Sequence, residues 1–135
     1  MTATIKDFML QDLSVLEETK DIKFPHFKHP FTVRALTAVE FEQIQRDATR
    51  TTRNKKTGQL NSEQDNFRLF DLVVANGVVS PDLSSAELQA HFKTATAADT
   101  ARKMLKAGQY QDLAEEILRL SGFDVDGLVE EVKKG

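Results

Sequence analysis

The side chains best suited to hold a metal ion are two histidines of the segment HFKH, His26 and His29. Two imidazoles three residues apart can share a zinc ion, but a closed zinc site takes about four ligands. The chain has no cysteine, and the third histidine, His91, lies far along the sequence. A turn bounded by Pro25 and Pro30, with solvated histidines, explains the pair more simply. We therefore predict no metal site and no other cofactor.

The carboxylates and hydroxyls form no pattern typical of a catalytic centre. Glu115 and Glu116 are adjacent, and adjacent residues of a helix point in different directions. Five serines fall at expected helix ends, where helix capping explains them without a nucleophilic role. They are Ser62, Ser80, Ser84, Ser85 and Ser121. Glycine-rich phosphate loops, GxSxG and HExxH are absent from the sequence, and we predict a protein that is not an enzyme.

A basic stretch over positions 46–56 could contact phosphate groups or a protein partner. It contains Arg46, Arg50, Arg53, Lys55 and Lys56. The formal net charge of −3 opposes generic binding to nucleic acids or acidic membranes. The segment TAADTARKML, which would have to read DNA bases, carries mainly Ala and Thr where such a helix exposes several Arg, Asn or Gln. We therefore predict neither nucleic acid nor membrane as a partner, and retain the three arginines as candidate contacts for a protein.

The length and composition are those of one domain that spans residues 1–135 and relies on packing alone. Without cysteine there are no disulfides, which is compatible with a reducing cytoplasm. No apolar run approaches the roughly 18 residues of a membrane span. The start, MTATIKDFMLQDL, lacks the basic flank and apolar core of a signal peptide. We expect a soluble protein of the cytoplasm.

The segment FRLFDLVVANGVV, residues 67–79, predicts a helix at the centre of the fold. It is apolar nearly all round, and a helix of this kind is buried. We expect its cap at position 61 or 62, and its end at Asn76-Gly77 through a left-handed residue. Phe70 and Val74 are expected to be fully buried.

Before this helix, the pattern predicts two small elements. Residues 1–17 form an amphipathic segment with apolar side chains at helical spacing, Phe8 and Met9 among them. Such a stripe can dock on the protein's own core, which we expect, or on a partner, for which Phe8 and Met9 are then candidate contacts. Residues 19–36 alternate between apolar and polar and predict a β-hairpin with prolines near its turn.

Residues 37–135 predict a helical cluster. Thr37 and Glu40 form a capping box that starts a helix. Residues 51–61 are rich in Thr, Asn and Lys without any apolar period, and predict a mobile loop. Further helices are expected after the central one. They begin after Ser84 and after Thr96, run from Tyr110 to Gly122, and cover residues 125–132, while Gly108 ends the second of them.

The expected fold class is mainly α, a compact helical domain of about six short helices with a small N-terminal β-hairpin, or α+β by strict count. Four short helices joined by tight junctions leave no room for strands among them.

Four short segments occur in an order that carries a family resemblance. They are Arg34 to Glu40, Gly77 to Val79, Gly108 to Tyr110, and Ser121 to Phe123. In these family landmarks, and over roughly residues 19–126, the sequence resembles the XkdN-like tail assembly chaperones of Gram-positive phages and phage-like elements. Gln109 departs from the pattern, since the family often carries an acid there.

The resemblance implies a non-enzymatic protein that binds the tape-measure protein and helps tail-tube protein subunits collect on it. Such a protein acts in the cytoplasm of the bacterial host and is not in the mature virion; a homo-oligomer is compatible with this role. The resemblance assigns no binding residue by position. The alternative is a small phage DNA-binding or regulatory protein that uses the basic stretch 46–56.

Overall fold

A computed structural model describes residues 2–9, 11, 12, 16 and 18–125 of the chain. These residues form a single 3-10 turn, five α-helices and five strands. The turn is η1 (Ile5–Phe8), and the helices are α1 (Ala38–Ala48), α2 (Asn66–Gly77), α3 (Ala86–Phe92), α4 (Ala97–Met104) and α5 (Ala107–Leu120). The strands are β1 (Thr19–Ile22), β2 (Phe31–Arg34), β3 (Thr49–Arg53), β4 (Leu60–Gln64) and β5 (Val78–Ser80). The fold is therefore α+β, with more strand than the expected mainly α class allows.

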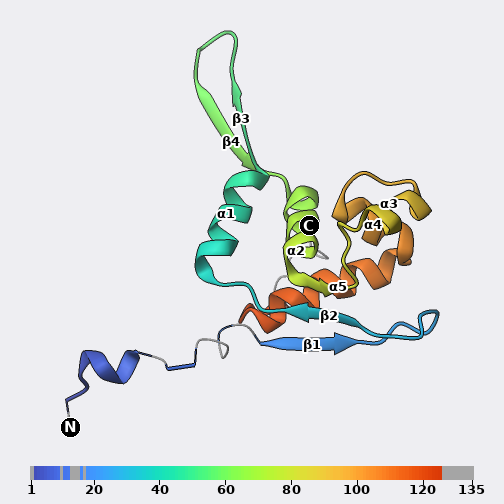
Figure 1. The fold of residues 1–135 in the computed structure, drawn as a ribbon. Coiled ribbons are helices and arrows are strands. Elements are labelled where there is room, and N and C mark those ends of the chain that lie inside the picture. Colours follow the sequence, from blue (N-terminus) through green and yellow to red (C-terminus); the bar gives the residue numbers. More distant parts are fainter. Residues whose placement is uncertain (1, 10, 13–15, 17, 126–135) are drawn as a thin grey trace.

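The strands form two separate sheets. One has the order β1-β2-β5, and the other contains β3 and β4 alone. β1 and β2 pair antiparallel, with Thr19 opposite Arg34 and Ile22 opposite Phe31, which confirms the hairpin predicted for residues 19–36. The sequence analysis did not identify β5, because three residues directly after a helix leave no alternating pattern to detect. Figure 1 shows the two sheets at opposite ends of the molecule, with α1 and α2 between them.

The core lies where α2 and α5 meet the inner face of β2. α2 contacts α1, α4 and α5, and α5 contacts β1 and β2. The largest fully buried side chains come from β2, α2, α4 and α5. They are Phe31, Val33, Val73, Val74, Thr100, Leu113 and Ile117. The central position of the helix predicted from residues 67–79 is thus confirmed for its C-terminal half.

The N-terminal half of α2 is less buried than its composition predicts. Val74 is fully buried as expected, but Phe70 is only partly buried, and Phe67 is 86% exposed. An apolar sequence does not specify which sides of a helix its neighbours cover, and α1, α4 and α5 leave one side of α2 open. The predicted cap is also wrong, since Asp65 accepts hydrogen bonds from the backbone N–H groups of Phe67 and Arg68.

Gly77 has another role than the one expected. It does not adopt the left-handed conformation, and the chain passes from α2 directly into extended backbone at Val78. The absence of a side chain at position 77 lets α2 approach Ile117 of α5. α2 does end at Gly77, as expected, but it ends without a left-handed residue, and the glycine is needed for the close packing against α5.

In the described part of the N-terminal segment, η1 is a single turn. Thr4 and Asp7 make the capping box, with Thr4 N donating to Asp7 Oδ2 at 2.8 Å. The expectation that its apolar stripe docks on the core is wrong, because Ile5, Phe8 and Met9 are all exposed. One turn can present few side chains to a core, and η1 is one turn long.

The segment predicted as an irregular loop, residues 51–61, forms most of a β-hairpin. β3 and β4 pair over Thr49 to Gln64, and Gly58 takes a left-handed conformation with φ +71° in the turn between them. The threonines of β3 favour extended backbone, and a turn that contains Asn54 and Gly58 closes the hairpin. Polar strands that are exposed on both faces lack the apolar alternation on which the sequence analysis relied. The mobility of this segment stays a prediction.

Most of the other helix ends agree with the sequence. The Thr37–Glu40 box caps α1, Thr96 caps α4, and Gly122 follows α5 in the left-handed region. Ser85 caps α3 in place of Ser84, and Gly108 lies inside α5 instead of ending α4. The helix expected over residues 125–132 lies outside the described residues except for Val125. Among the described residues, no helix combines the length and apolar character needed to cross a bilayer.

Candidate partner-binding surfaces

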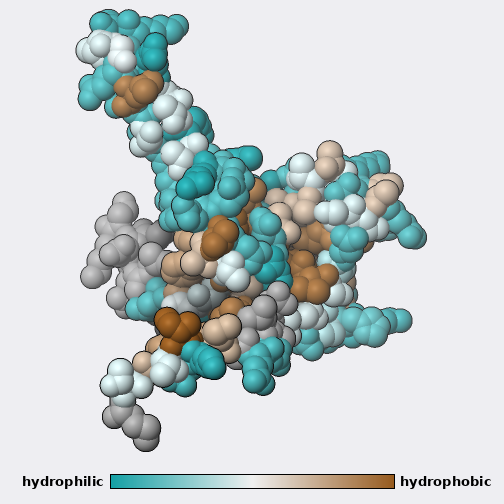
Figure 2. Space-filling model, turned by 60° about the vertical axis from the view of Figure 1, so that its left-hand side comes forward, coloured by the Kyte–Doolittle hydropathy of each residue, from teal (hydrophilic) through white to brown (hydrophobic). Residues whose placement is uncertain are grey.

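The hairpin of β3 and β4 is a projecting arm, which we define as residues 49–64. All ten residues of its two strands are exposed. Its turn is held by Asn54, whose backbone N–H donates to the carbonyl of Gln59 at 2.8 Å and whose Oδ1 accepts from Lys56 N at 2.8 Å. Figure 2 shows the arm as mainly hydrophilic, with one hydrophobic patch near its tip, whereas hydrophobic side chains collect on the body below it.

The structure does not bring the three candidate arginines into one patch. Arg46 lies on α1 and pairs with Glu42 at 2.6 Å, and Arg50 pairs with Asp65 at 3.0 Å. Arg50 and Arg53 are three residues apart on β3, so they point to opposite faces of the arm. Arg53 forms no ion pair with any described residue. The arm is therefore basic on both faces instead of presenting one phosphate-binding surface.

Asp65, at the base of the arm, is the cap of α2 as well as the partner of Arg50. The hydrogen bond from the backbone of Arg68 is the main cause that lowers its pKa below the ordinary value, and Arg50 adds to the effect. The same carboxylate thus connects the arm to the start of the central helix.

The two apolar candidates are Phe8, the last residue of η1, and Met9, which follows it, and η1 lies at the other end of the molecule from the arm (Figure 1). Phe8 is 74% exposed and Met9 is 67% exposed. Isolated exposed apolar residues are common, but three within five positions, counting Ile5, form a local cluster. This cluster, which we call the N-terminal apolar turn, is available to a partner.

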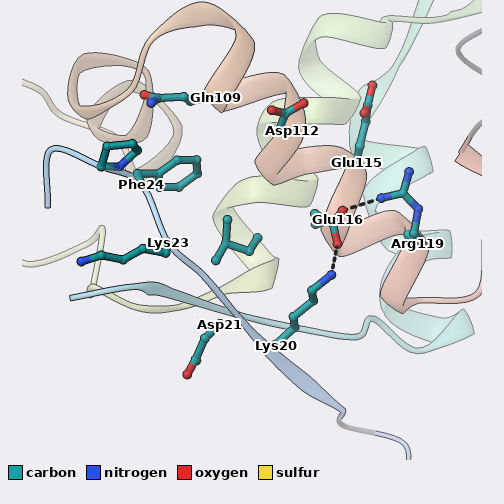
Figure 3. Close-up of a pocket in the computed structure, with 11 residues that line it drawn as sticks. Lys20, Asp21, Lys23, Phe24, Gln109, Asp112, Glu115, Glu116 and Arg119 are labelled. Carbon is teal, nitrogen blue, oxygen red and sulfur yellow. Dashed lines mark hydrogen bonds and ion pairs between the residues drawn. The ribbon is translucent and has the colours of Figure 1, made fainter. Parts of the chain in front are cut away.

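A groove of about 690 Å³ lies between β1 and α5 (Figure 3). In this β1–α5 groove, Glu116 of α5 accepts a hydrogen bond from Lys20 Nζ at 2.7 Å and also pairs with Arg119. The bond from Lys20 is the main cause that lowers the pKa of Glu116 below its usual value. Asp112 and Glu115 also line the groove, and neither has a Lys or Arg of the described residues at ion-pair distance. The α5 side of the groove therefore keeps an acidic rim.

Sequence reasoning missed this groove. Its two walls lie far apart in the chain, as the 96 positions between Lys20 and Glu116 show. The sequence does contain one usable signal, since Asp112, Glu115 and Glu116 recur on a helix at the spacing that puts acids along one side.

Residues 5–133 match the sequence profile described as Phage XkdN-like tail assembly chaperone protein. The chain belongs to this family. A relative, the Phage-like element PBSX protein XkdN of Bacillus subtilis (strain 168), is 24% identical over 128 residues, which cover 86% of each chain. The crystal structure of the protein yqbn matches with a TM-score of 0.61 at 18% identity, over 85% of this chain and 99% of that one, which is a likeness of fold.

The first landmark of this XkdN-like chain joins three elements. Arg34 of β2 donates from Nη1 to Glu40 Oε1 at 3.0 Å and from Nε to the carbonyl of Asn76, at the end of α2, at 3.1 Å. Glu40 also accepts from the backbone N–H of Thr37 at 3.1 Å. The hydrogen bond from Arg34 is the main cause that lowers the pKa of Glu40 to about 2. This landmark is thus a structural junction of β2, α1 and α2.

The last landmark connects the end of α5 to the first half of the chain. Ser121 Oγ accepts from the backbone N–H of Leu36 at 2.8 Å and donates to the carbonyl of Ile117 at 2.6 Å. The ring of Phe123 lies against that of Phe41, with 4.6 Å between centroids. These contacts again hold elements together.

Tyr110, in the third landmark, takes part in a polar network between helices. Its hydroxyl donates to Asp71 Oδ1 of α2 at 2.6 Å, and Arg102 of α4 bonds both Asp71 and Asp99. Burial is the main cause that raises the pKa of Tyr110, and the bond to Asp71 is the main cause that raises that of Arg102. These three XkdN-like landmarks therefore record packing, and the arm, the N-terminal apolar turn and the groove are the candidate partner-binding surfaces.

The histidine pair has no ligand geometry in the described part of the chain. The nearest polar contact of His26 is between Nε2 and the carbonyl of Met104, at 3.0 Å. No group of three or more His, Asp or Glu is placed to share an ion within residues 2–9 and 18–125 or the three isolated described positions. His26 instead packs beside Phe27, with ring centroids 4.2 Å apart.

Proposed function

We propose that this XkdN-like chain is a non-enzymatic chaperone that binds the tape-measure protein of its phage during tail assembly. It acts in the cytoplasm of the bacterial host, assists the tail-tube protein in collecting on the tape-measure protein, and leaves before the virion is complete. Membership of the tail assembly chaperone family supports this role. The single structural observation that carries the binding step is the exposure of Ile5, Phe8 and Met9 on the N-terminal apolar turn.

The binding mode follows from the physical chemistry of those side chains. Transfer of a large apolar side chain from water into a protein contact is favourable by about 1.5–3 kcal/mol before the costs of association. A tape-measure protein is a long chain. Its apolar helix faces would aggregate before tail assembly unless another protein bound them. Apolar anchors that dock into such a face, with charged residues around them, can hold a partner and still release it.

The perturbed titratable groups support a binding role over catalysis. Glu40, Glu116, Asp65 and Tyr110 all have a shifted pKa, and each is engaged in a contact between structural elements or at a helix cap. A catalytic acid or base needs its proton-carrying atom directed at a substrate. Here those atoms are directed at Arg34, Lys20, backbone N–H groups and Asp71.

The test is co-expression of the chain with the tape-measure protein of the same phage, read out as soluble, co-purified complex. We expect the triple variant Ile5→Ser, Phe8→Ser, Met9→Ser to lose most of the soluble tape-measure protein while remaining folded itself. Val39→Ser on α1 is the matched control, because Val39 is as exposed as the turn residues but lies on another element. Absence of a complex with the unaltered chain would overturn the proposed function. Equal capture by the triple variant would overturn the assignment of the N-terminal apolar turn.

A further inference from the structure

The arm carries open strand edges. β3 and β4 pair only with each other in the described part of the chain, so each keeps an outer row of backbone N–H and C=O groups. A two-stranded ribbon without a buried face is marginal in water. The arm has no buried face, and Leu60 at its end is exposed as well. Open strand edges and the lack of a buried face are typical of a hairpin that pairs with another protein surface.

Among the described strands, β1 is at an open edge of the other sheet, and the backbone groups that point outward from it can be assigned. The carbonyl of Glu18 accepts from Ala35 N at 2.7 Å, and the register pairs Lys20 with Val33 and Ile22 with Phe31. Hydrogen-bonded positions alternate in an antiparallel pair. The backbone groups of Lys20 and Ile22 therefore face β2, and those of Thr19 and Asp21 face away from the sheet, beside the β1–α5 groove.

The charges of the arm and the groove are complementary. The arm carries four basic side chains and one acid, Glu63. The groove is lined by four acids and three cations. Of the acids on α5, Asp112 and Glu115 have no cationic partner among the described residues, while Glu116 is already neutralised by Lys20 and Arg119. Arg53 at the end of β3, with the two lysines of the turn, can supply the missing cations.

The edge of β5 is a poorer acceptor than the edge of β1. β5 has three residues and is followed by Pro81, which has no backbone N–H to donate. Neither the β1–α5 groove nor the smaller groove beside α1 is lined by a residue of β5. The arm of one molecule also cannot reach its own groove, because α1 and α2 stand between the arm and the sheet (Figure 1).

We propose that two copies of this chain associate head to tail, with β3 of one arm added to β1 of the next copy and its basic residues along the acidic rim of α5. The contact uses different surfaces on the two copies, so it leaves an arm and a groove free at the ends and builds rings or open chains. The strand lengths match, because β3 has five residues and β1 has four. This self-association stands independently of the proposed binding to the tape-measure protein.

The experiment is sedimentation velocity of the full chain over a range of protein concentrations at low and at physiological salt. We expect a mass that rises with concentration and falls with salt, because exposed charges are screened. An arm variant, Arg53→Glu with Lys55→Glu, and a groove variant, Asp112→Lys with Glu115→Lys, should each weaken association by roughly tenfold, the equivalent of about 1.4 kcal/mol. Lys103→Glu, an exposed charge reversal on α4, is the control and should leave association unchanged.

Mixing the two variants gives the decisive result. The acidic arm of the arm variant is complementary in charge to the basic groove of the groove variant. The unaltered arm of the groove variant is likewise complementary to the unaltered groove of the arm variant. The mixture should therefore associate as strongly as the unaltered chain. A chain that stays monomeric at every concentration overturns the proposal, and so does failure of the mixture to recover. The groove variant could instead self-associate like the unaltered chain but lose capture of the tape-measure protein. That result would assign the groove to an extended segment of the tape-measure protein and would also overturn the proposed self-association.

Discussion

Gly77 of α2 faces Ile117 of α5 so closely that a Cβ atom at position 77 would lie 2.5 Å from Ile117 Cγ2. Ile117 is fully buried, so it has no open space into which to move. The pair fixes the distance between two of the helices that form the core.

We expect Gly77→Ala to destabilise the fold by about 1–3 kcal/mol, because the added methyl overpacks this contact. The measurement is urea unfolding, read as a change in midpoint at constant slope. Gly108→Ala is the matched control: it lies in α5 with no atom within 4 Å of an added Cβ, and should be neutral or stabilising by up to about 1 kcal/mol. Equal effects of the two substitutions would contradict the close contact.

The two ends of α2 should respond differently to truncation. Val74→Ala is expected to cost about 2 kcal/mol because it leaves a cavity in the core, whereas Phe67→Ala should change stability by less than about 0.5 kcal/mol. Both values come from the same denaturant titration. A larger loss for Phe67 than for Val74 would mean that the buried side of α2 is wrongly assigned.

Glu40 should contribute a stability that depends on pH. Its pKa is lowered from 4.5 to about 2, so the contribution is present above pH 4.5 and is lost as the pH falls towards 2. We expect about 1 kcal/mol, less than the full shift implies, because the side chain is 35% exposed and solvent screens the pair. The measurement is the difference in unfolding free energy between the unaltered chain and Glu40→Gln, from pH 7 to pH 2. A difference that does not shrink below pH 4.5 would argue against an ionised Glu40 in the junction with Arg34.

The arm should be the first site of limited trypsin digestion. Lys55 and Lys56 lie in the exposed turn between β3 and β4, and the arm has no buried residue to hold it closed. Mass spectrometry of the first fragments in dilute protein identifies the cut. First cleavage within α4 or α5 would contradict the stability assigned to the helical core.

We expect no binding to random duplex DNA at physiological salt. Arg46 and Arg50 already pair with Glu42 and Asp65, and the few remaining cations of the arm face a net charge of −3 on the chain. A gel shift decides between the chaperone and the DNA-binding alternative. Binding at sub-micromolar protein that survives about 0.2 M salt would favour the alternative.

Local signals in the sequence determined much of the fold. The capping box of Thr37 and Glu40, the cap at Thr96 and the end of α5 at Gly122 each depend on residues within a few positions of one another. The hairpin of β1 and β2 likewise follows from alternation and prolines. The family was predictable for the same reason, since its landmarks are short segments in a fixed order.

Tertiary structure alone decided the features that join distant parts of the chain. The end of α2 at Gly77 could be predicted, but its close contact with Ile117 could not, and the apolar residues of α2 do not reveal which side stays open at Phe67. The arm was missed because its strands have no buried face and so no apolar period, and the groove because its walls come from β1 and α5. Periodicity in a sequence indicates that one face of an element is buried, but only the tertiary structure shows which other element covers that face.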